Sequence, residues 1–357
     1  MARQWYSLNE LRQKFHDLIV IFARIAVAIA LIGTCMRIQL ISIALLAWIG
    51  PGAAAAQEAE PFQTRNLAPG LAIFGLPTWQ AKIPEPALMA ALDIANHYQI
   101  GQRDTELLLF DGETMRLNLT YARPLGRRWS VRAELPFVRQ SGGMLDNVID
   151  GWHSFFNMPD GGRNNRPENL LLYEIARDGQ VGYRLDASGQ GIGDLMLGIG
   201  RSFGPEERFV ARATLKVPTG NEHILASSGS ADWSLTLLRA REVTALKRAA
   251  GYYWGVGALA LGEADPIPYS SKDAAFVGIV GGSLKIFERI GFKVQLDVSS
   301  ALYDSPLRAL GESTAQASLG GWWEIDESSR LEFAINEDVK VGTAPDVALH
   351  LGLYWAL

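Results

Sequence analysis

The sequence predicts an all-β fold, an up-and-down antiparallel transmembrane β-barrel of about twelve strands. Three observations predict it. Apolar and polar residues alternate with a period of two in many segments, the segments are about ten residues long, and short turns alternate with longer loops between them. The composition agrees, because 36 Gly, 10 Trp, 10 Tyr and 14 Phe in 357 residues suit short strands and turns better than helices.

The alternation defines each strand in turn. In TMRLNLTY, for example, Met115, Leu117 and Leu119 share one face, whereas Arg116 and Asn118 share the other. The predicted strands are residues 87–98, 113–123, 129–139, 192–203, 208–218, 231–241, 250–262, 274–287, 291–302, 313–324, 330–337 and 346–357.

The connections differ in length on the two sides of the predicted barrel. Residues 125–128, 204–207, 288–290 and 326–329 form short turns, and 140–190 is the longest of the intervening segments. Short periplasmic turns and long extracellular loops are typical of outer-membrane barrels. A soluble β-sandwich alternates too, but its strands usually have about five or six residues, too few for a tilted crossing of a bilayer.

The C-terminal stretch DVALHLGLYWAL follows the two-residue period most strictly, with apolar residues at every second position from Val347 to Leu357. Such a strand has one face toward lipid and the other toward a wetter interior. We expect it to close the barrel against the first strand. It resembles the C-terminal signal by which barrel-assembly machinery recognises outer-membrane proteins, although that signal usually ends in an aromatic residue and here Trp355 comes two residues earlier.

The first 56 residues are interpreted as a processed region. The stretch MRIQLISIALLAWIGPGAAAAQ has the basic start, apolar centre and Ala-rich end of a secretory signal peptide, cleaved after Ala56. Translation would then start at Met36, with residues 1–35 an over-long gene prediction, or at Met1; an N-terminal membrane anchor is the alternative. The single cysteine, Cys35, excludes an intrachain disulfide.

Residues 57–86 form a Pro-rich segment before the barrel of residues 87–357. Its five prolines preclude a regular helix or strand, and its stretch LAIFGLPTW is too apolar to hang free in the periplasm. We therefore expect this segment to lie in the periplasm or to plug the lumen, where it would occupy or cap the periplasmic mouth of the barrel.

Charge and motifs exclude several classes of function. A net charge of -5 and a pI near 5.6 argue against nucleic acid as a partner. The motifs of P-loop nucleotide binding, zinc proteases, serine hydrolases and CxxC redox sites are missing, so no cofactor and no metal is predicted. In GQGIGDLMLGIG, the glycines at 191, 193, 198 and 200 are interpreted as turn and lumen-facing positions where neighbouring groups approach closely.

Charged residues fall on the faces that the period assigns to the lumen. Charges of both signs on such faces indicate either a wet channel or an ion-paired filling, and a barrel of twelve strands lies between filled and open sizes. The predicted lumen and selectivity residues are Asp93, Arg116, Arg132, Glu134, Asp194, Arg212, Lys216, Lys293, Asp297 and Glu332.

The longest loop has too many apolar residues to be merely solvated, and long loops are usually functional or disordered. It is predicted to fold inward as a constriction or lid. A loop packed on itself through Asp–Arg pairs is the alternative. The predicted constriction residues are Asp150, Trp152, His153, Phe155, Phe156, Asp160 and Arg163.

Two histidine groups define the weaker hypotheses. Closure of the first strand against the last would bring His97 near His350, with Asp93 one repeat below, as a metal or base cluster or as plain packing. His223, with Ser227 and Ser228 in the same loop, lacks an obvious acidic partner for hydrolysis.

Several stretches resemble a proteobacterial family of predicted outer-membrane barrels, domain of unknown function 3187. They are PFQTRNLAPGLAIFGLP at 61–77, DGE at 111–113, DGWHSFFNMPDGGR at 150–163, GIGDLMLGIG at 191–200 and LKVPTG at 215–220. The last two also resemble, more weakly, barrels linked to uptake of aromatic or apolar compounds. The resemblance implies fold and location but no activity.

The sequence therefore predicts an exported protein of the outer membrane of a Gram-negative bacterium. It would be a narrow channel or transporter for an unknown small solute rather than an enzyme, with outer-membrane lipids, lipopolysaccharide and the assembly machinery as partners. A hydrolase of lipid or lipopolysaccharide, and a closed structural barrel, are the alternatives.

Overall fold

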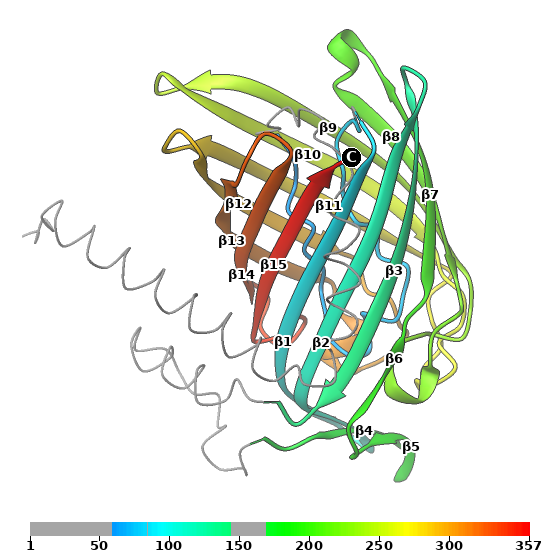
Figure 1. The fold of residues 1–357 in the computed structure, drawn as a ribbon. Helices are drawn as coiled ribbons and strands as arrows, with labels where there is room; N and C mark the ends of the chain where they lie inside the picture. The colour runs from blue at the N-terminus through cyan, green and yellow to red at the C-terminus, as the bar shows by residue number, and fades with distance from the viewer. Residues whose placement is uncertain (1–58, 84, 144–168) are drawn as a thin grey trace, which may run out of the picture. The chain divides into compact units, whose positions relative to one another are not determined.

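The structure is a computed structural model that describes residues 59–83, 85–143 and 169–357 (Figure 1). The predicted signal peptide and all seven predicted constriction residues lie outside the described residues, in 1–58 and 144–168. Among the described residues, no helix is long and apolar enough to cross a bilayer.

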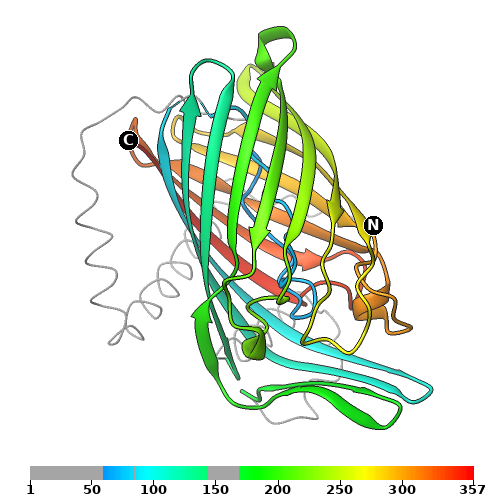
Figure 2. The same cartoon turned by 90° about the vertical axis from the view of Figure 1, so that its right-hand side faces the viewer.

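Twelve antiparallel strands close into a barrel, as the sequence predicts. Each pairs with the next in chain order, β3 passing directly to β7, and β15 pairs with β1 to complete the ring (Figures 1 and 2). The barrel strands are β1 (Ala87–Arg103), β2 (Glu106–Leu125), β3 (Trp129–Ser141), β7 (Leu195–Phe203), β8 (Phe209–Val217), β9 (Asp232–Ala245), β10 (Arg248–Ala260), β11 (Ala274–Lys285), β12 (Ile290–Ser299), β13 (Thr314–Glu324), β14 (Ser329–Asp338) and β15 (Val347–Ala356).

The outer face of the barrel is apolar. Leu235, Phe276 and Leu319 are 63%, 68% and 56% exposed, and each comes from a strand whose alternate residues are buried. Trp129 and Trp323 are exposed at the end with the short turns. A continuous apolar surface with aromatic residues at its border is what a lipid-facing barrel presents.

The structure departs from the predicted strands on one side. β1 and β2 continue past the predicted ends as a long hairpin that turns at Asp104 and Thr105. The region predicted as the long loop 140–190 contains three short strands in its described part: β4 (Leu172–Arg177), β5 (Gln180–Leu185) and β6 (Gly189–Ile192). β4 adds to the extended part of β2, and β6 to the end of β3.

Residues 59–83, here called the inner segment, run through the interior of the barrel as an irregular hairpin (Figure 2). Lys82 pairs with Glu207 at a short turn, which places one end of the segment at the short-turn end of the barrel. Its bend lies at the opposite end, where Tyr303 donates to the carbonyl of Gly70 at 2.6 Å. The segment therefore runs along the length of the lumen.

The main apolar core lies inside the long-loop end of the barrel. Leu71, Ile73 and Phe74 at the bend of the inner segment are at most 2% exposed, and they pack in one cluster with residues of the loops and the extended hairpin. The rings of Phe74 and Tyr303 lie 5.2 Å apart between centroids. This core closes the long-loop end with apolar side chains.

Candidate functional site

The candidate site is the contact surface between the inner segment and the barrel wall. All ten predicted lumen residues face it: nine are at most 7% exposed, and Asp297 is half-buried. The two-residue period therefore placed them correctly on the inner face. Their part in solute selectivity stays a prediction.

One carboxylate organises the arginines on the β2–β3 side of the wall. The Glu134 carboxylate forms ion pairs with three guanidinium groups. The nitrogen–oxygen distances are 3.0 Å to Arg132, 3.5 Å to Arg116 and 3.6 Å to Arg65 of the inner segment. The Thr78 hydroxyl donates to the same carboxylate at 3.1 Å. Three guanidinium groups thus share this one carboxylate, and the carboxylates of Asp93 and Asp194 attract two of them, Arg65 and Arg116, electrostatically.

The inner segment and this cluster also exchange neutral contacts. Arg132 donates to the side-chain oxygens of Gln63 at 3.0 Å and Gln80 at 3.1 Å, which lie on the two limbs of the segment. Arg65 in turn donates to the carbonyls of Phe74 and Leu76. The arginines thus hold both limbs of the segment against β3.

A buried lysine anchors the bend of the segment to β8. The Lys216 ammonium lies 3.0 Å from the carboxylates of Asp194 and Asp232 and donates to the Ile73 carbonyl at 3.0 Å. It also donates to the Ser228 hydroxyl at 2.5 Å. All its donors thus have acceptors, as burial of an ammonium group requires.

A glutamine of β12 binds the backbone of the inner segment before its bend. Gln295 of β12 accepts from the Phe62 amide at 2.8 Å and from the Tyr253 hydroxyl at 2.9 Å. Beside it the Lys293 ammonium lies 4.5 Å from the centroid of the Phe62 ring and 2.8 Å from Glu332. Phe62 is fully buried, so this contact is a desolvated cation–π pair.

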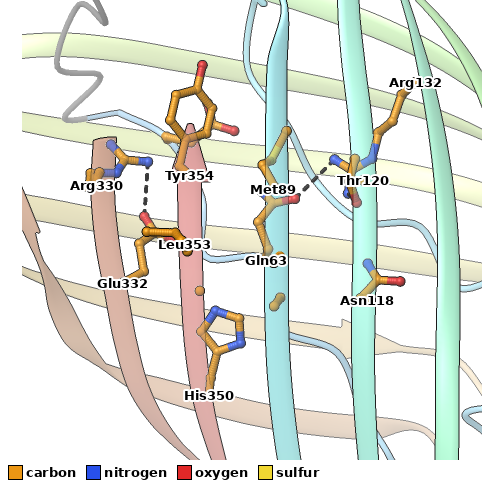
Figure 3. A pocket seen from close by; sticks show the side chains of 14 residues that line it. Gln63, Met89, Asn118, Thr120, Arg132, Arg330, Glu332, His350, Leu353 and Tyr354 are labelled. Atoms are coloured by element: carbon orange, nitrogen blue, oxygen red, sulfur yellow. Dashed lines mark hydrogen bonds and ion pairs between the residues drawn. The ribbon is translucent and has the colours of Figure 1, made fainter. Parts of the chain in front are cut away.

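A small cavity of about 30 Å³ lies between the inner segment and strands β1, β2, β3, β14 and β15, with room for about two ordered waters (Figure 3). Figure 3 shows Arg330 paired with Glu332 on one side and Gln63 reaching Arg132 on the other. His350 Nε2 and Asn118 Oδ1, on residues that line it, have no hydrogen-bond partner among the described residues. Its wall can therefore bind water or polar groups of a solute.

Glu60 lies at this cavity and links the two limbs, because its carboxylate accepts from the Ala81 amide at 3.2 Å. Burial raises the pKa of Glu60 to about 7, and the nearby Arg330 and Lys293 only partly oppose this. A carboxyl group with a raised pKa binds its proton more tightly when the segment is docked. Docking is therefore strongest below the usual carboxyl pKa, weakens as the pH rises, and changes no further above about pH 7.

We expect the inner segment to become more accessible to protease between pH 5 and pH 8, with a change in docking free energy of up to about 3 kcal/mol. Limited proteolysis of the refolded protein at each pH measures this. His350 and Glu332 face the same cavity. Glu60→Gln isolates the effect of Glu60, since it should remove the pH dependence; a variant with the parent's pH profile would contradict the assignment.

The predicted histidine cluster needs correction. The register sets Asp93, not His97, opposite His350, and the His350 Nδ1 lies 2.7 Å from the Asp93 carboxylate. His97 is four residues further along β1, about 13 Å at the usual rise per residue, and bonds Thr114 at 2.8 Å. Among the described residues, no group of His, Cys, Asp and Glu side chains is arranged to hold a metal ion.

The second histidine group does not assemble a hydrolytic site. His223 is exposed, whereas Ser227 and Ser228 are at most 1% exposed. Ser228 bonds Lys216, and the Ser227 hydroxyl accepts from the Gly229 amide. Among the described residues, therefore, this histidine and these serines have different surroundings.

Some residues of the site are not among the predicted lumen residues. Gln295 lies between Lys293 and Asp297 on the inner face, so the same two-residue period would have identified it. Asp232 starts β9 directly after a loop, where alternation gives no signal. The inner-segment residues have no periodicity at all, because their chain is irregular.

The barrel fold is shared with solved outer-membrane proteins. An outer-membrane channel of Pseudomonas putida F1 is similar, with a TM-score of 0.50, 12% sequence identity, and coverage of 80% of this chain and 98% of that chain. The toluene transporters TodX of Pseudomonas putida and TbuX of Ralstonia pickettii have TM-scores of 0.34 and 0.37 and identities of 12% and 8%. These matches cover 85% and 77% of this chain, and 96% and 90% of TodX and TbuX.

At such identities the likeness concerns the fold alone. The sequence has no significant match among curated proteins. The model of one sequence family, described as a protein of unknown function (DUF3187), matches residues 37–356, which include all described residues except the last. The chain therefore belongs to the DUF3187 family, the same family that its sequence stretches indicated.

Proposed function

We propose that this protein is an outer-membrane channel for a small solute, closed at rest by its own inner segment. The main support for this proposal is the way in which the inner segment is bound to the barrel wall. Within residues 59–83 no residue belongs to a strand, and the segment meets the wall through side chains such as Arg132, Lys216 and Gln295. Its departure would leave every pairing of the barrel strands intact.

The polarity of the lumen supports a channel over a closed structural barrel. A lumen that only needs filling is as stable, or more stable, with apolar side chains, because burying ion pairs costs desolvation energy. Here the wall instead keeps charged groups such as Lys293 and Glu332 at most 4% exposed beneath the inner segment. Removal of the segment would expose a charged, wettable passage.

The location follows from the outer face. Its apolar surface suits contact with outer-membrane lipids and lipopolysaccharide, and β15 would be the strand that assembly machinery recognises. Export through a signal peptide cleaved after Ala56 completes the proposal. No specific observation favours lipid hydrolysis. Among the described residues, His223 is exposed to solvent, whereas Ser227 and Ser228 are buried.

Single-channel conductance in a planar bilayer tests the proposal with refolded residues 57–357 and with a variant lacking residues 59–83. We expect rare openings from the first protein and discrete, salt-dependent steps from the second. Circular dichroism and heat-dependent mobility in detergent gels verify that both barrels are folded. A folded variant that stays silent would support a closed structural barrel instead.

A further inference from the structure

The terminal nitrogens of one buried arginine of the wall lack hydrogen-bond partners among the described residues. Arg212 of β8 is 4% exposed, and neither its Nη1 nor its Nη2 has a hydrogen-bond partner among the described residues. A guanidinium group carries five N–H donors and stays charged, so burying it without an acceptor is costly. The other buried cations of the wall, such as Lys216 and Arg132, have carboxylate partners.

Glycines of β7 form the floor under this side chain. A Cβ atom at Gly200 would lie 3.2 Å from the guanidinium carbon of Arg212, and one at Gly198 would lie 3.6 Å from its Cδ. Both glycines face the lumen between β3 and β8. No side chain on β7 therefore separates Arg212 from Arg132 at these two positions.

Arg212 and Arg132 line one small cavity of about 10 Å³, about the room that one water needs. A halide ion is somewhat larger than water, and a slight outward shift of the long arginine side chains would admit it. Glu134 also lines it, but its two oxygens already receive Arg132, Arg116, Arg65 and Thr78. The cavity thus has two cations beside it. Glu60 attracts Arg212 electrostatically, but no carboxylate among the described residues accepts a hydrogen bond from its Nη1 or Nη2.

We propose that Arg212 and Arg132 bind a halide-sized anion, chloride being the abundant one, between the inner segment and the wall of the closed barrel. The anion would accept hydrogen bonds from the Nη1 and Nη2 groups of Arg212, which lack acceptors. With the inner segment displaced, the same arginines would face the passage and favour anionic solutes, such as carboxylates. Only this second step rests on the proposed channel function.

Thermal unfolding in detergent tests the site in the closed barrel. We compare sodium chloride with sodium gluconate, an anion too large for the cavity, at equal ionic strength. The parent should unfold at a higher temperature in chloride. Arg212→Gln should lose that difference, and Arg127→Gln should keep it, because Arg127 lies at a short turn with its side chain 84% exposed. No chloride effect in the parent, or an equal effect in Arg212→Gln, would overturn the site.

Diffraction from crystals grown in bromide gives a test that does not need the variant to fold. An anomalous peak within about 3.5 Å of the Arg212 nitrogens is expected. Ordered water alone at that place would overturn the proposal.

The solute class is tested by the reversal potential in a salt gradient. In the barrel lacking residues 59–83, Arg212→Gln should lower the chloride-to-potassium permeability ratio severalfold, and an unchanged ratio would overturn the selectivity role. If that barrel is silent, the proposed function fails, while the unfolding and diffraction results still decide the anion site.

Discussion

Lys216→Met is expected to destabilise the plugged barrel by about 3 to 5 kcal/mol and to raise the frequency of channel openings. The substitution leaves Asp194 and Asp232 buried without their shared ammonium group, at 6% and 1% exposure. It also removes the donor to the Ile73 carbonyl, so the bend of the inner segment loses its anchor. Urea unfolding in detergent and planar-bilayer recordings measure the two effects.

Lys285→Met is the matched control. Lys285 pairs with Glu324 at 2.9 Å near a short turn, where the two side chains are 21% and 18% exposed. Water screens this pair, and its loss should cost about 1 kcal/mol or less. Adding Asp232→Asn to Lys216→Met should restore part of the stability, because it removes one unpaired charge. Equal effects of the two lysine substitutions would show that Lys216 is not an anchor.

A disulfide between Thr64→Cys and Ser318→Cys is expected to hold the inner segment in place and to reduce channel openings by at least about tenfold, since a disulfide contributes roughly 2 to 4 kcal/mol. The two hydroxyl oxygens are 3.2 Å apart, one on the segment and one on β13. Residues 57–357 contain no other cysteine, because the single cysteine of the chain is Cys35. Bilayer recordings before and after addition of a reductant measure the change.

The lock is most informative in the Lys216→Met background, where openings should be frequent. The oxidised triple variant should be nearly silent, and reductant should restore its openings. Thr64→Cys alone, which cannot form the bond, controls for the loss of the hydroxyl. Conduction by the oxidised form at the level of the reduced form would mean that the solute passes without movement of the inner segment.

The sequence alone determined the barrel and the faces of its strands. The two-residue period at Phe292, Val294 and Leu296 sets these side chains outward and Lys293 inward, and it needs only neighbouring residues to be read. Gly198 and Gly200 were interpreted as turn or lumen-facing positions because they are glycines, and in the structure the Arg212 side chain lies close to both.

The two-residue period does not predict the register between neighbouring strands or the path of an irregular segment. The sequence predicted that His97 lies near His350, whereas the structure pairs Asp93 with His350. The prediction failed because the register between the first and last strands depends on contacts between the two ends of the chain, which a local pattern does not contain. β4 and β5 have six residues each and gain their stability from an extended hairpin that the local pattern did not predict.

The tertiary structure likewise decided which charges meet. Sequence placed Arg132, Arg212 and Lys216 in the lumen, but only the fold shows that Lys216 is satisfied and Arg212 is not. The path of the inner segment determines the difference. The segment supplies a carbonyl acceptor to Lys216 but none to the terminal nitrogens of Arg212. A proline-rich segment has no period, so its path depends on contacts with side chains of the barrel wall that are far away in sequence.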